Sequence, residues 1–188
     1  MKKPFAIAVS VFVSFTLWGQ GAVHFGNSPT TLISTNDFQG HLGNILGAGN
    51  YGFGLYLGPL GSSGDSLNLT ARASNGNIAG RFDGGTEPLP FPAGTQLSFQ
   101  VRGWSSFGGA TYEQAYNNAS GGASDIFLGQ STIGFLTVPA SGTIELFGTG
   151  PGQISGFELA VLVPEPSTCA LIALGSALLL LFRRKSVA

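Results

Sequence analysis

The side chains that could carry chemistry in this chain are few and widely spaced. Its two histidines, His24 and His41, form neither an H-x-x-x-H nor an H-E-x-x-H pattern. A zinc site would need a further ligand such as Asp37, and the surroundings of His41 (Asp37-Phe38-Gln39-Gly40) are typical of a loop. The histidines therefore predict no metal centre.

Two pairs of acids have residue types suited to hydrolysis. Asp83 with Glu87, or Glu145 with Glu158, could supply the acid and the base of a glycoside hydrolase. Asp83 and Glu87 could also offer oxygens to calcium, but their segment lacks the spaced acids of a calcium loop. Isolated surface acids and a glycine-rich turn are the simpler interpretation. We therefore expect no enzyme activity, no catalytic residue, no metal and no cofactor.

The single cysteine, Cys169, lies in an apolar run near the C-terminus. The region between residues 22 and 163 thus has neither a thiol nor a disulfide, and its stability must come from packing and backbone pairing. Cys169 lacks the context of a lipidation site, so we interpret it as a membrane residue rather than a nucleophile.

The charge of the central region differs from that of the whole chain. The charged residues between 22 and 163 are three arginines and eight acids: Arg72, Arg81, Arg102, Asp37, Asp65, Asp83, Glu87, Glu113, Asp125, Glu145 and Glu158. Three positive minus eight negative charges leave about −5, whereas the whole chain carries −1. A surface of this kind has no basic footprint, which excludes nucleic acid as a partner.

The C-terminal segment has three parts in a set order. Pro164, Glu165 and Pro166 form a triplet that continues neither strand nor helix, because each proline fixes its φ angle and lacks a backbone donor. An uncharged apolar run from Cys169 to Phe182 follows it. Three cations then close the segment: Arg183, Arg184 and Lys185. This order predicts a folded domain that ends before the triplet, then a membrane helix stopped on the cytoplasmic side.

The triplet, the apolar run and the basic cluster together resemble the C-terminal sorting signal of PEP-CTERM proteins, found in Gram-negative bacteria that make extracellular polysaccharide. The resemblance implies that exosortase, a multi-pass membrane enzyme, recognises the triplet and processes the protein near it during export. It implies transient anchoring in the inner membrane and a final place at the cell surface or in the extracellular matrix. A plain tail anchor is the alternative, and the resemblance assigns no activity to the exported domain.

The N-terminus has the pattern of a signal peptide. Lys2 and Lys3 precede an apolar stretch from Phe5 to Leu17, and small residues around Gly21 favour cleavage after that residue. An uncleaved anchor is the alternative, but the apolar stretch is short for a span. Basic residues flank both apolar ends on their outer sides, which places the region between them across the membrane by way of the secretion machinery. We expect a signal peptide at 1–21, one exported domain at 22–163 and the sorting signal at 164–188.

Alternating hydrophobicity with glycine and proline punctuation dominates the central region. The clearest predicted strands are 51–57, 97–102 and 157–161, and weaker ones are 23–25, 31–33, 67–72, 77–79, 126–128, 133–138 and 143–147. A single helical turn is expected at 111–116. The pattern predicts an all-β fold, an antiparallel β-sandwich, flanked by the signal-peptide helix and the C-terminal transmembrane helix. The last predicted strand ends just before the triplet, so we expect the domain to lie close to the membrane before processing.

Aromatic residues on the polar side of two strands suggest two functions for the exported domain. Tyr56 and Trp104 fall on the less apolar faces of their strands, where each could stack on a ligand, as could Tyr112. Packing of Trp104 on the Arg102 stem is the simpler interpretation, and an ion pair between Arg102 and Glu113 is conceivable. We expect a structural or interaction protein of the surface or matrix; the alternative is a carbohydrate-binding module that retains secreted polysaccharide.

Overall fold

The computed structural model describes residues 21–39 and 42–162 of the chain. The predicted signal peptide, His41, the Pro164 triplet, the predicted transmembrane helix and the closing basic cluster lie outside the described residues. The elements in chain order are β1 (Ala22–Gly26), β2 (Ser34–Asn36), β3 (Leu42–Asn44), β4 (Tyr51–Pro59), η1 (Gly64–Ser66), β5 (Asn68–Ser74), β6 (Asp83–Pro88), β7 (Gln96–Ser105), η2 (Ser106–Gly108), α1 (Tyr112–Ser120), β8 (Phe127–Gln130), β9 (Gly134–Thr137), β10 (Thr143–Glu145) and β11 (Glu158–Val161). Within these residues no helix is long and apolar enough to span a bilayer.

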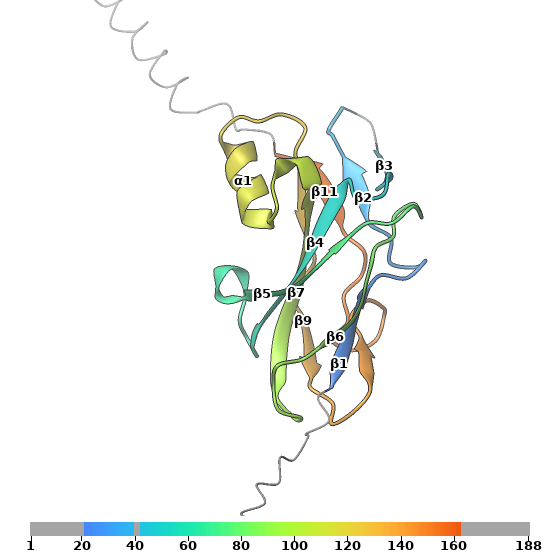
Figure 1. The fold of residues 1–188 in the computed structure, drawn as a ribbon, viewed down its shortest axis with the longest axis vertical. Coiled ribbons are helices and arrows are strands. Elements are labelled where there is room, and N and C mark those ends of the chain that lie inside the picture. The colour runs from blue at the N-terminus through green and yellow to red at the C-terminus, as the bar shows by residue number, and fades with distance from the viewer. Residues whose placement is uncertain (1–20, 40–41, 163–188) are drawn as a thin grey trace, which may run out of the picture.

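The strands form two sheets (Figure 1). A three-stranded sheet has the order β10-β1-β6, and an eight-stranded sheet has the order β3-β2-β11-β8-β7-β4-β5, with β9 also pairing with β7. The mostly β prediction is confirmed. The prediction of a wholly antiparallel arrangement is wrong, because β1 pairs parallel with β10 and β11 pairs parallel with β2. Both parallel pairs join segments that are more than a hundred residues apart. The alternation of hydrophobic residues along one strand gives no information about which distant strand it pairs with, or in which direction.

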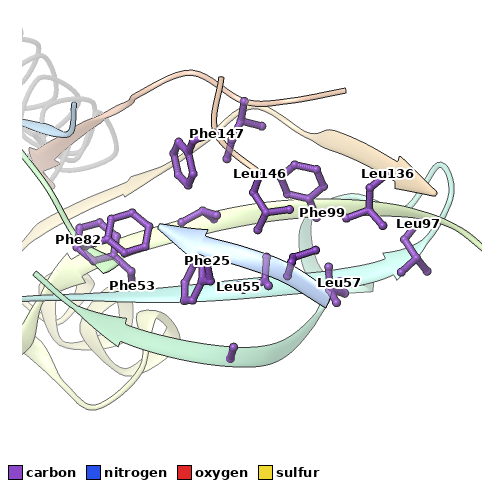
Figure 2. Close-up of a cluster of buried hydrophobic side chains, with 14 of the residues drawn as sticks. Phe25, Phe53, Leu55, Leu57, Phe82, Leu97, Phe99, Leu136, Leu146 and Phe147 are labelled. Atoms are coloured by element: carbon purple, nitrogen blue, oxygen red, sulfur yellow. The ribbon is translucent and has the colours of Figure 1, made fainter. Parts of the chain in front are cut away.

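The hydrophobic core lies between the two sheets (Figure 2). β4 contributes Phe53, Leu55 and Leu57 from one face, because alternate side chains of a strand point to the same side. β7 contributes Leu97, Phe99 and Val101 in the same way, and β1 adds Val23 and Phe25 from the other sheet. The two longest strands, β4 and β7, therefore provide most of the large sheet's apolar face, against which the smaller sheet packs.

Several strands differ from the predicted ones. Residues 31–33 and 77–79 form no strand, and β2 begins at Ser34. The segment from Asp83, expected as a glycine-rich turn, is the strand β6. It has no apolar alternation of its own, and its place comes from antiparallel pairing with β1. A side chain at Gly84 would meet the Phe25 ring at 2.7 Å, so the glycine permits the close approach of this strand.

Helix α1 covers the opposite face of the large sheet, over β4, β7 and β8. Its N-cap is Thr111, whose hydroxyl accepts a hydrogen bond from the Gln114 amide at 3.2 Å. Ala115 and Ala119 of the helix pack with Trp104 in a second buried cluster. The short predicted helical turn is therefore a nine-residue helix, and the large sheet is covered on both sides.

Candidate functional site

The pairing register of β4 and β7 determines which side chains lie at the base of the candidate site. Trp104 pairs with Gly52, and Arg102 pairs with Gly54. A side chain at Gly52 would lie 2.7 Å from the Trp104 indole, so the glycine provides the space in which the indole packs. The large polar and aromatic groups of β7 therefore lie flat on the side of the sheet that faces α1.

The guanidinium of Arg102 is the centre of this layer. It donates from Nη1 to Glu113 Oε1 at 3.3 Å, and its other two nitrogens donate to backbone and amide oxygens: Nη2 to Gly64 O at 2.7 Å and Nε to Gln100 Oε1 at 3.1 Å. Its Cζ atom lies 4.2 Å from the Tyr56 ring centroid. The Arg102 side chain is 7% exposed, so this guanidinium positions other groups and offers little of itself to a ligand.

The carboxylate of Glu113 is held on one side and open on the other. Tyr56 Oη donates to Glu113 Oε1 at 2.8 Å, while the Glu113 side chain remains 51% exposed. Burial acts to raise the pKa of Glu113, but hydrogen bonds from Tyr56 and Thr111 and the Arg102 charge outweigh it and hold that pKa below its usual range. Burial and the bond to Glu113 raise the pKa of Tyr56, so its phenol stays a neutral donor. The site presents a fixed carboxylate at neutral pH.

A groove of about 560 Å³ opens over these residues. Its lining consists of acids, amides, tyrosines, the Arg102 guanidinium and one glycine: Gly64, Asp65, Arg102, Tyr112, Glu113, Tyr116, Asn117 and Gln130. The Tyr112 and Tyr116 rings stack with centroids 6.5 Å apart, and Tyr116 is 48% exposed. Carboxylate and amide oxygens beside exposed aromatic faces suit a ligand that has many hydroxyl groups and apolar C–H faces.

The two predicted stacking residues are not exposed. Tyr56 is 2% exposed and Trp104 is 3% exposed, because α1 and Arg102 cover their face of the sheet. Neither ring is therefore open to a ligand in this structure. Trp104 is packed, as the simpler interpretation predicted, but its partners are those of the second buried cluster, including Ala115 and Ala119. Its Nε1 donates to Gly109 O at 2.9 Å. The conceivable ion pair between Arg102 and Glu113 is present.

Sequence reasoning missed Tyr116, the most exposed ring of the groove. Its signal was available. Tyr112 and Tyr116 are four residues apart and follow the N-cap Thr111, a spacing that puts both rings on one helix face. Tyr112, already considered for stacking, does border the groove.

The structure brings together one acid from each of the two predicted pairs, Asp83 and Glu145. Both contact His24: Nε2 lies 3.3 Å from Asp83 Oδ1 and Nδ1 lies 2.7 Å from Glu145 Oε2. The bond to Glu145 raises the pKa of His24, and only the protonated ring can donate to both carboxylates. This cluster joins three strands of the small sheet. Within residues 21–39 and 42–162, no group of three or more potential ligands is placed to hold a metal ion.

Comparison with protein families identifies the C-terminal segment. The family described as the PEP-CTERM protein-sorting motif matches residues 162–185. The chain carries a PEP-CTERM sorting motif. The match begins at Leu162, where the described structure ends, and it includes the triplet Pro164, Glu165 and Pro166 and the cations Arg183 to Lys185. Comparison with curated proteins and with solved structures finds no match.

The sorting motif indicates how the protein is transported, but it gives no information about what the groove binds. It implies an exported protein that is transiently anchored in the membrane and is processed by exosortase. The match covers only the C-terminal part of the chain, so it says nothing about the function of the domain that precedes Leu162.

Proposed function

We propose that this chain is a non-catalytic structural or interaction protein of the cell surface or extracellular matrix, delivered there by exosortase processing. The single observation that carries the proposal is the PEP-CTERM motif at residues 162–185. The acidic, lysine-free character of the domain and its open polar groove support a role in contact with other extracellular material. The signal peptide and the secretion machinery supply the first step of this route.

Intact-mass analysis of material recovered from the cell surface tests the route. The species expected begins near Ala22 and ends near the triplet, because both terminal signals are removed during export. A Glu165→Ala variant is expected to keep its C-terminal segment in the membrane fraction. The proposal fails when the surface species of the natural chain still contains residues 171–182 in cells with active exosortase.

A second candidate function is a carbohydrate-binding module that retains secreted polysaccharide. The observation in its favour is the exposed Tyr116 ring beside Glu113, Asn117 and Gln130 in one groove. A pyranose ring could place its C–H face on the tyrosine and its hydroxyls against the carboxylate and amide oxygens. Because Asp65 and Glu113 are both acidic, the groove favours a neutral polysaccharide over a polyanion.

Affinity electrophoresis through gels that contain neutral dextran or anionic polygalacturonate tests this second function. Tyr116→Ala is expected to weaken retention by the neutral polymer about 5- to 10-fold, which corresponds to about 1–1.4 kcal/mol of lost stacking. Phe107→Ala is the matched control, since Phe107 is 70% exposed and does not line the groove. Equal retention of both variants, or retention by the anionic gel alone, contradicts the module.

A further inference from the structure

A second groove, of about 420 Å³, lies at the end of the domain from which the sorting motif departs. Its lining carries no charged side chain: Phe38, Tyr112, Tyr116, Leu128, Ala160, Val161 and Leu162. Tyr112 and Tyr116 also line the groove at Glu113, so α1 separates an apolar groove from a polar one. We call the apolar one the terminal groove.

Strand direction brings Phe38 to the terminal groove. β2 and β11 are parallel, with Asn36 opposite Ala160, so the residues that follow both strands leave the sheet at the same end. Phe38 follows β2 by two residues, and Leu162 follows β11 directly. β2 and β11 therefore end at the same edge of the domain (Figure 1), and Phe38, which is exposed, follows the first of them.

Phe38 has an unusual backbone conformation and an exposed side chain. Its φ angle is +58°, in a region that large residues rarely adopt, and its amide donates to Asn36 Oδ1 at 2.8 Å. The ring is 59% exposed, and Leu42 on the adjoining strand β3 is 69% exposed. Two apolar side chains are thus exposed at this end of the large sheet.

We propose that the terminal groove and Phe38 dock on the lipid surface while the C-terminal segment anchors the protein. The proposal rests on the anchored stage of the proposed function. Six residues, 163–168, separate Leu162 from the apolar run that starts at Cys169. A fully extended connection of that length reaches at most about 25 Å. The end that carries Leu162 therefore stays near the bilayer, where aromatic and aliphatic side chains are stabilised at the interface.

Charge defines the kind of lipid surface. Between residues 22 and 163 there are three arginines against eight acids, and Asp37 stands next to Phe38. Attraction to anionic lipid is therefore absent, and contact must come from apolar burial. The proposed partner is a zwitterionic lipid surface, and added anionic lipid is expected to weaken the contact.

Two tryptophan reporters in the full chain test the docking. The chain is reconstituted in phosphatidylcholine vesicles with and without bromine on the acyl chains, as Phe38→Trp and as Phe135→Trp. The two rings are similarly exposed, at 59% and 56%. Phe135 lies on β9, which pairs with β7 from Gln96 to Phe99. At the other end of β7, residues Arg102 to Trp104 pair with β8, and β8 pairs in turn with β11. The reporters therefore sit toward opposite ends of the sheet.

The expected result is that bromine removes about half or more of the emission that Phe38→Trp adds to the natural chain, and little of that added by Phe135→Trp. Equal quenching of both, quenching of Phe135→Trp alone, or no quenching overturns the proposal. Emission of Phe38→Trp that shifts with protein concentration but ignores bromine assigns the groove to a second copy, and also overturns it. Intact-mass analysis of surface material is independent of these outcomes, so failure of docking is distinct from failure of the sorting route.

Discussion

Replacing Phe82 by alanine is expected to lower the free energy of unfolding by about 3–5 kcal/mol. Phe82 is 1% exposed and stacks on Phe53 with ring centroids 4.1 Å apart and planes at 10°. It also makes edge-to-face contacts with Phe25 and Phe147, with ring centroids 5.2 Å and 5.6 Å away (Figure 2). Alanine would leave a cavity bounded by the rings of Phe53 on β4, Phe25 on β1 and Phe147 after β10, which cannot all move into it together.

Denaturant unfolding followed by near-ultraviolet circular dichroism measures this loss. Phe135→Ala, at a ring that is 56% exposed, is the matched control and is expected to cost less than about 1 kcal/mol. Comparable losses in the two variants would contradict the assignment of Phe82 to the centre of the core.

Replacing Arg102 by methionine is expected to cost about 2–4 kcal/mol, more than a surface ion pair would. Methionine keeps the apolar stem, but the buried Gln100 Oε1 and the partly buried Gly64 O lose their donors. The Tyr56 ring also loses the guanidinium above it. Arg72→Met is the control, since Arg72 is an exposed arginine on β5, which is separated from β7 by β4.

The same unfolding measurement on Glu113→Gln separates the two sources of that stability. Glu113 is half exposed and can regain water, so its neutral isostere is expected to cost less than about 1 kcal/mol. A loss in Glu113→Gln as large as in Arg102→Met would place the stability in the ion pair rather than in the hydrogen bonds from the guanidinium to Gln100 and Gly64.

Local pattern was sufficient for the strongest elements and for the route of the protein. Alternation predicted β4 and β7 because the face that packs against the small sheet repeats its apolar residues every second position, although the other face of both strands is buried as well. The order of triplet, apolar run and cations was readable because a sorting signal is recognised as a linear segment. Even the contact of Arg102 with Glu113 was accessible, since only a short turn and the start of α1 separate them.

Tertiary structure decided which residues are open to a ligand. Parity placed Tyr56 and Trp104 on the polar side of the sheet, but it carries no information about α1, which packs over that side and leaves Tyr116 exposed instead. The polar strand β6, the parallel pairings of β1 and β11, and the meeting of His24 with Asp83 and Glu145 also have no local signal. Each depends on contacts between segments distant in the chain, whose formation is driven by burial of the shared core and not by the preferences of the residues that meet.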